Sequence, residues 1–267
     1  MYMYHAIISD FDGTIVDHNL VLSPSVVAKV VEFQKNGFIF TIASGRGFLG
    51  DLADAVAKMK ILSPIIIRNG AEIVLPESKK VIYGKYIKTQ ISSEIIEYLI
   101  QEKDEFYVEK ADYTYSVEAK PGIHAPNENY KDIKLLEASD IPKILIKADS
   151  LTKADKIKNY LISNFNEQIS VKVNSLKDNI YAIDVNSIEV SKATAIEFLI
   201  DYMSLNMNEI VAIGDNMNDI SLFEHAGYRV AMGNAVDELK SIADFVTDSV
   251  EEQGIIKVID MILNDKI

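Results

Sequence analysis

Two carboxylates stand two residues apart near the start of the chain, in the segment Asp10-Phe11-Asp12-Gly13-Thr14. Like charges that share a buried pocket repel each other, so such a pair requires a cation or a shared proton. Gly13 allows the chain to bend so that both carboxylates face one pocket. The pair therefore indicates a charged reaction site, and an Asp-rich turn with helix-capping duties is the alternative.

A hydroxyl group ends the second apolar run, in Thr41-Ile42-Ala43-Ser44-Gly45-Arg46. A hydroxyl at a strand end, together with backbone N–H groups at the start of a helix, binds phosphate oxygens well. Ser44 is thus a candidate phosphate ligand, and an ordinary helix N-cap is the alternative.

Two further segments carry charge late in the chain. Lys192 falls in the first turn of a predicted helix, where a cation opposes the helix dipole, so it has either a function elsewhere or an ordinary solvated surface position. The segment Gly214-Asp215-Asn216-Met217-Asn218-Asp219 places two acids and two amides at one strand end. Such a cluster of hard oxygen ligands suits Mg²⁺.

Short apolar runs alternate with helical patterns around these segments, which predicts parallel βαβ units. The predicted strands are His5–Ser9, Phe38–Ala43, Ile65–Arg68, Glu209–Ile213 and Tyr228–Ala231. Helices are predicted from Ser23-Pro24 to Asn36-Gly37, over Phe48–Met59, from Ser191, over Asp219–Glu224 and over Gly254–Leu263. The polar residues follow the strands at their carboxyl ends, where ligands of open α/β sheets bind.

Between these two sets of units the regular alternation of strand and helix gives way to paired strands with helices between them, which predicts an inserted α+β module. A helix is expected from Ser92, then a hairpin of Phe106–Lys110 and Tyr113–Ala119, a weak helix after Asn129, a strand Lys143–Lys147, a helix Thr152–Phe165, and strands Ile169–Val173 and Ile180–Val185. We therefore expect a doubly wound, Rossmann-like α/β core with a parallel sheet, made of residues 1–84 and 187–267, and an inserted cap made of residues 85–186.

The ordered set of segments resembles the haloacid dehalogenase superfamily, and within it the Cof-like phosphatases that carry a large cap between the second and third motifs. The matching segments are Asp10-x-Asp12-Gly-Thr14, Ser44-Gly-Arg46, Lys192 and Gly214-Asp215-x-x-Asn218-Asp219. Asn69-Gly70-Ala71 also resembles the Asn-Gly that follows the third strand in this subgroup. Ser44 stands where many relatives have Thr, which keeps the hydroxyl.

The resemblance implies a Mg²⁺-dependent phosphatase that hydrolyses small phosphorylated metabolites, with sugar phosphates the typical class. Asp10 is then the nucleophile that forms an aspartyl-phosphate, and Asp12 the general acid and base. Mg²⁺ is expected on the carboxylates of Asp10 and Asp215 and on the backbone carbonyl of Asp12. Ser44, Gly45 and Lys192 are expected to bind the phosphoryl group, Asp219, Asn218 and Thr14 to support the site, and Arg46 and Asn69 to contact substrate.

The cap is expected to select the substrate, because the core recognises only the phosphoryl group. Polar cap side chains that could contact a sugar or ring are Glu109, Tyr113, Tyr115, Lys120, His124 and Asn127, each with packing as the alternative. A phosphomutase of the same superfamily keeps both acids and stays open. A non-enzymatic phosphoacceptor module would place its acceptor mid-domain and occupy about half this length.

Composition limits the partners. The 267 residues hold 27 Lys+Arg against 40 Asp+Glu, a formal net charge of −13, which disfavours nucleic acid as a partner. Cysteine is absent, which excludes disulfides and thiolate metal sites. No apolar run reaches the length of a membrane span and no basic secretory leader precedes the first strand, so we expect a cytoplasmic protein. We expect it to be a monomer or a homodimer.

Overall fold

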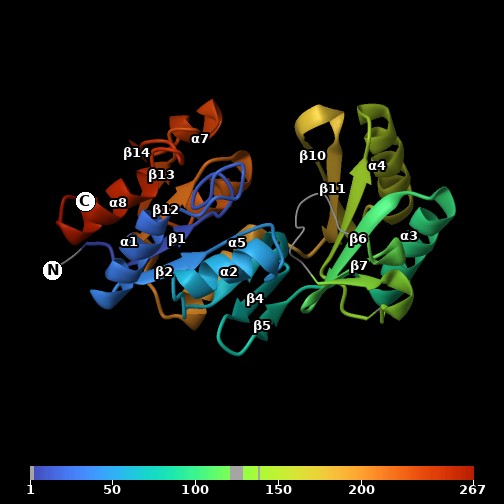
Figure 1. Cartoon of the computed structure of the whole chain (residues 1–267), viewed down its shortest axis with the longest axis horizontal. Helices are drawn as coiled ribbons and strands as arrows, with labels where there is room; N and C mark the ends of the chain where they lie inside the picture. The colour runs from blue at the N-terminus through green and yellow to red at the C-terminus, as the bar shows by residue number, and fades with distance from the viewer. Residues whose placement is uncertain (1–2, 121–128, 138) are drawn as a thin grey trace. The chain divides into compact units, whose positions relative to one another are not determined.

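The computed structural model describes residues 3–120, 129–137 and 139–267 (Figure 1). The chain divides into two compact units. The first, here called the core unit, comprises Met1–Arg46, Asp51–Tyr83 and Ser191–Ile267, and the second, the cap unit, comprises Gly47–Gly50 and Gly84–Val190. None of the helices that the described residues form has the length and apolar composition of a membrane span.

The core unit is built on a five-stranded sheet in the order β14-β13-β12-β1-β2, and every pairing in it is parallel. Its strands are β1 (Ala6–Ser9), β2 (Ile39–Ile42), β12 (Ile210–Gly214), β13 (Tyr228–Ala231) and β14 (Phe245–Val246). The helices of this unit are α1 (Pro24–Lys35), α2 (Gly50–Lys58), α5 (Lys192–Tyr202), α6 (Ile220–Phe223), α7 (Asp237–Ser241) and α8 (Gly254–Leu263). All four residues of β1 are buried, as expected for a central parallel strand. The predicted parallel α/β core is confirmed.

The third predicted strand differs from its expected place. β3 (Ile65–Ile67) pairs antiparallel with β4 (Glu72–Leu75), and β5 (Lys80–Gly84) completes a separate three-stranded sheet. A single parallel bridge, Ala43 to Ile66, connects β3 to the end of β2. The chain reverses between β3 and β4 at Asn69 and Gly70, whose φ angles are +63° and +93°. The apolar pattern of residues 65–68 predicted the strand but not this reversal.

The cap unit holds a six-stranded sheet in the order β10-β11-β9-β6-β7-β8, antiparallel except for the β7–β8 pair. Its strands are β6 (Glu105–Lys110), β7 (Tyr113–Ser116), β8 (Tyr130–Asp132), β9 (Lys143–Ala148), β10 (Ile169–Ser175) and β11 (Tyr181–Ser187). Helices α3 (Thr89–Glu102) and α4 (Leu151–Phe165) pack on one face of this sheet over an apolar cluster that includes Ile95, Ile144 and Ile157 (Figure 1). The predicted α+β character of the insertion is thus confirmed.

Two local predictions in the cap are wrong. The weak helix after Asn129 is instead β8 followed by a single 3₁₀ turn, Ile133–Leu135. The strand expected to reach Ala119 ends at Ser116, because Glu118 and Ala119 adopt positive φ angles of 59° and 53° that break a ladder.

Candidate active site

The candidate site lies where β1 and β12 end side by side. Ser9 is in register with Ile213, and the backbone N–H of Asp10 donates to the carbonyl of Ile213 at 2.9 Å. Asp10 therefore follows β1 at the level where β12 ends at Gly214 and Asp215 follows it. Because the two strands are parallel, both carboxylates lie at the carboxyl edge of the sheet.

A buried lysine connects two of the acids. The Nζ of Lys192 donates to Oδ1 of Asp219 at 2.8 Å and to Oδ1 of Asp10 at 3.3 Å. All three side chains are buried, and Asp219 has no exposed surface. Lys192 is the first residue of α5, so the tertiary ion pairs offset its unfavourable position at a helix N-terminus.

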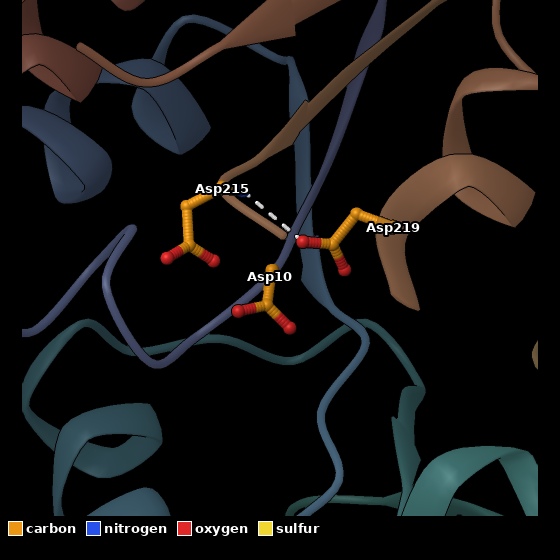
Figure 2. A group of neighbouring side chains, drawn as sticks. All are labelled: Asp10, Asp215 and Asp219. Carbon is orange, nitrogen blue, oxygen red and sulfur yellow. Dashed lines mark hydrogen bonds between the residues drawn. The ribbon is translucent and has the colours of Figure 1, made fainter. Parts of the chain in front are cut away.

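The second oxygen of Asp219 is also occupied. Its Oδ2 accepts hydrogen bonds from the backbone N–H groups of Asp215, at 3.1 Å, and Asn216, at 3.2 Å. Figure 2 marks the first of these two bonds. Asn216 and Asp219 form a capping box around the 3₁₀ turn Met217–Asp219. Asp219 is thereby fixed as a bridge between Lys192 and the backbone that carries Asp215.

The crowding of negative charge perturbs the acids strongly. Burial raises the pKa of Asp10 well above its usual range, with further increases from Asp219, Asp12 and Asp215, while Lys192 opposes the shift. Burial and the charges of Asp219 and Asp12 raise the pKa of Asp215 to about 7. Burial lowers the pKa of Lys192, but the carboxylates of Asp219 and Asp10 outweigh that effect and raise its pKa overall. Lys192 alone thus does not offset the negative charge that gathers around Asp10 and Asp215.

The donor set fits a hard divalent cation. One carboxylate oxygen each from Asp10, Asp215 and Asp219 lies within 4.8 Å of the others, and Figure 2 shows the three side chains together at the strand ends. Because both oxygens of Asp219 already accept hydrogen bonds, Asp10 and Asp215 are the acids suited to bind metal. A few carboxylates with remaining positions open to water is the environment that Mg²⁺ prefers.

Asp12 is held by an arginine. Arg46 donates from Nε to both carboxylate oxygens, at 3.0 and 2.8 Å, and from Nη2 to Oδ1 at 2.7 Å. The Asp12 side chain is 46% exposed, unlike buried Asp10. The guanidinium also lies 5.9 Å from the centre of the Phe11 ring. Arg46, which the sequence suggested as a substrate contact, therefore contacts the predicted acid–base group.

Ser44 lies beside the end of β1. The N–H of Ala43, the residue after β2, donates to the carbonyl of Ser9 at 2.9 Å, and the buried Ser44 is the next residue along the chain. Its Oγ accepts from the N–H of Arg46 at 3.1 Å. A Cβ built on Gly45 would lie 2.7 Å from Oδ1 of Asn69, so this loop and Asn69 are in close contact.

The remaining predicted residues differ in their surroundings. The hydroxyl of Thr14 is buried and, among the described residues, has no hydrogen-bond partner. Gly13, with φ +76°, packs so closely on Asp215 that a Cβ would overlap the carboxylate. Asn218 is exposed, unlike the buried Asp10 and Asp219.

The predicted cap residues are also spread over different environments. Glu109 is buried, 3.6 Å from Nζ of Lys143, and Lys120 forms an exposed ion pair with Glu118. The rings of Tyr113 and Tyr115 lie edge to face. His124 and Asn127 lie outside the described residues.

Sequence analysis missed three polar residues near the site. Asn234 donates from Nδ2 to the carbonyl of Gly13 at 2.9 Å. Arg68 and Glu72 form a buried ion pair on either side of Asn69-Gly70. The only available signal for that pair was an arginine at the end of an apolar run followed by a glutamate four residues later.

Comparison with known proteins identifies the class. Residues 7–259 match the family model of the haloacid dehalogenase-like hydrolases, so the chain belongs to this family of enzymes. The chain is similar to YkrA of Bacillus subtilis (strain 168), with 32% identity over 260 residues, covering 92% of this chain and 93% of that protein. It is also similar to the 5-amino-6-(5-phospho-D-ribitylamino)uracil phosphatase YwtE of the same organism, with 28% identity over 283 residues and 96% coverage of each.

A solved structure shares the fold over almost the whole chain. The crystal structure of a haloacid dehalogenase-like hydrolase from Bacteroides thetaiotaomicron superimposes with a TM-score of 0.85 at 24% identity, covering 97% of this chain and 99% of that one. The resemblance that the motifs indicated is confirmed, and membership of a hydrolase family sets aside the non-enzymatic phosphoacceptor module.

Proposed function

We propose that this enzyme is a Mg²⁺-dependent phosphatase of small phosphorylated metabolites, with sugar phosphates as the expected class, and that it acts through an aspartyl-phosphate on Asp10. One observation carries the proposal. A buried aspartate at the end of the central strand is bonded to a buried lysine and grouped with two further acids. Structural ion pairs rarely gather so much like charge in one place without a ligand to neutralise it.

Asp10 is the proposed nucleophile. A carboxylate is weakly nucleophilic, but one held rigidly next to phosphorus gains from effective molarity, and the covalent step divides one displacement into two. Two hydrogen bonds hold Asp10 in place: its backbone N–H donates to the carbonyl of Ile213, and its carboxylate accepts from Nζ of Lys192. Lys192 and the hydroxyl of Ser44, with the N–H of Gly45, would bind the phosphoryl oxygens.

Asp10 and Asp215, with the backbone carbonyl of Asp12, would hold Mg²⁺. When bound, the ion would neutralise the charge of the phosphoryl group and of the two carboxylates. Asp219 is the proposed positioning residue for Lys192, since it bonds the ammonium with one oxygen and the Asp215 backbone with the other.

Asp12 is the proposed general acid and base. It would protonate the leaving alkoxide in the first step and take a proton from water in the second. Its bidentate contact with Arg46 would hold the Asp12 carboxyl group in one orientation until substrate arrives. Arg46 would then act on Asp12 in addition to any contact with substrate.

The inserted residues 85–186 are the proposed substrate-selecting cap, and residues 1–84 and 187–267 the proposed catalytic core. The name of the relative YwtE describes a phosphate ester on a ribityl chain. A phosphorylated polyol or sugar is accordingly the first class to test on this chain.

The test is hydrolysis of p-nitrophenyl phosphate with Mg²⁺ by the wild type, Asp10→Asn and the control Asp54→Asn, whose side chain is exposed on α2. We expect turnover by the wild type and the control only. Equal turnover by Asp10→Asn would reject the nucleophile. A panel of sugar phosphates, measured for free phosphate and for transfer to a second hydroxyl, then separates a phosphatase from a phosphomutase.

A further inference from the structure

The loop between β3 and β4 has an unusual backbone. Arg68, Asn69 and Gly70 adopt φ angles of +53°, +63° and +93° in succession. Only glycine visits this region freely, and a run of three such residues is disfavoured for L-amino acids. The loop therefore requires contacts that hold it in this conformation.

An ion pair closes the loop. Nη1 of Arg68 donates to Oε2 of Glu72, and the two side chains are only 2% and 6% exposed. Arg68 is one of the largest fully buried side chains among the described residues. Glu72 is the first residue of β4 and lies opposite Ile67 of β3, so the pair links the two ends of the loop.

The same loop contacts two separate parts of the candidate site. On one side, the N–H of Arg68 donates to the carbonyl of Arg46 at 2.8 Å, and the N–H of Asn69 donates to the carbonyl of Ser44 at 3.2 Å. These two bonds attach the Ser44–Arg46 loop to the β3–β4 loop.

On the other side, Gly70 packs against the start of α5. A Cβ built there would lie 2.7 Å from the carbonyl oxygen of Ser191 and 2.9 Å from Cα of Lys192. The β3–β4 loop thus lies between the segment that carries the Ser44 hydroxyl and the residue that carries the Lys192 ammonium.

We propose that the Arg68–Glu72 ion pair is a positioning device for phosphate binding: it fixes the β3–β4 loop, which in turn sets the Ser44–Arg46 segment and the start of α5 with Lys192. Neither residue needs to touch the substrate for this role. The proposal rests on the proposed function, since it concerns the groups that would bind the phosphoryl oxygens.

The chemistry of the pair favours positioning over stability. The free energy lost by removing two charges from water is about as large as the free energy gained from their attraction. Apolar residues of similar volume therefore often make the folded protein equally stable. A planar guanidinium paired with a carboxylate instead restricts both side chains to a narrow geometry. That restriction suits a loop that must bring together groups from two distant segments.

The test replaces both partners, because removing one would leave a buried charge. Arg68→Met combined with Glu72→Leu removes the pair while keeping the site apolar. The control applies the same change to the ion pair of Arg229 and Asp244, in Arg229→Met combined with Asp244→Leu, since that pair joins Arg229 of β13 to the segment before β14. Arg68→Lys keeps the charge but loses the planar fork, and serves as the conservative variant.

Four quantities are measured for each variant: the free energy of unfolding in urea, kcat for p-nitrophenyl phosphate, KM for the same substrate, and the inhibition constant of inorganic phosphate. Hydrogen exchange of the peptides that contain Arg68 and Asn69 is followed in parallel. We expect the double variant to stay folded, to exchange faster in this loop, and to show KM and the phosphate inhibition constant raised roughly 10- to 100-fold. Arg68→Lys should recover part of the phosphate affinity, and the control should match the wild type.

A folded double variant with wild-type KM and phosphate inhibition would overturn the proposal. If the double variant does not fold, Arg68→Lys decides: unchanged phosphate affinity and loop exchange would also overturn it. Failure of the proposed function has a different signature, because the wild type itself would then release no p-nitrophenol and bind no phosphate.

Discussion

The high pKa of Asp215 makes a specific prediction about metal-free stability. The pKa of this carboxyl is 3.8 without perturbation and about 7 in the folded protein, raised by burial and then by the charges of Asp219 and Asp12. Because the folded-state pKa is the higher one, the stability that Asp215 contributes is fully present below pH 3.8 and is lost as the pH rises through about 7. Between pH 5 and pH 8 this loss amounts to roughly 3 kcal/mol.

Asp215→Asn removes the titrating group and keeps the backbone N–H that donates to Asp219. In EDTA, the unfolding free energy of the variant relative to the wild type should therefore rise by roughly 3 kcal/mol from pH 5 to pH 8. Urea denaturation at the two pH values measures this difference. Asp54→Asn, exposed on α2, is the control for loss of one negative charge.

The comparison with the wild type isolates Asp215, because burial and the neighbouring carboxylates raise the pKa of Asp10 as well. A difference between Asp215→Asn and wild type that does not change with pH would refute the argument that buried like charge destabilises the metal-free site. A stabilisation by Mg²⁺ that is equal in both proteins would refute the assignment of Asp215 as a ligand.

Three other predictions concern the same site. Lys192→Met leaves the buried carboxylates of Asp10 and Asp219 without their counter-ion, so we expect about 3–5 kcal/mol of destabilisation in urea, and an unchanged unfolding midpoint would contradict the buried pairs. Gly70→Ala should destabilise the protein by more than about 1 kcal/mol and lower its affinity for phosphate. The control Gly37→Ala has φ +88° and open space around it, so it should show only the cost of placing alanine at a positive φ angle. Equal destabilisation by the two substitutions would show that the contact of Gly70 with α5 is unimportant. Chelation with EDTA should abolish turnover and lower the thermal midpoint, and Mg²⁺ at about 100 times its dissociation constant should restore about 2.7 kcal/mol of stability; full activity in EDTA would exclude the metal.

The sequence predicted the parts of the fold that follow from local pattern. Short apolar runs that end in polar residues predicted β1, β2 and β12, and parallel pairing then requires their carboxyl ends to meet. The proximity of Asp10 and Asp215 follows from that rule once β1 and β12 are known to be neighbours. The separation of an α/β core from an antiparallel cap sheet followed from the change in the predicted order of elements, from alternating strands and helices to paired strands.

Features that depend on the sign of a backbone φ angle, or on contacts between residues far apart in the sequence, were not predictable from local pattern. Ile65–Ile67 has the composition of a core strand, and only the left-handed Asn69-Gly70 turn directs it into the antiparallel sheet with β4. The contact between Arg46 and Asp12 joins residues 34 positions apart, and no sequence pattern links two charged residues at that separation. The burial of Arg68 was not predicted either, because arginine is mostly exposed in folded proteins.

The most direct test of the central claim is to trap the covalent intermediate. Enzyme mixed with p-nitrophenyl phosphate and Mg²⁺ is quenched in acid within one turnover, digested and analysed by mass spectrometry. We expect one phosphoryl group on the peptide that contains Asp10, and none in Asp10→Asn. A phosphoryl group on another residue, or phosphate release in a burst with no modified peptide at any quench time, would contradict the account.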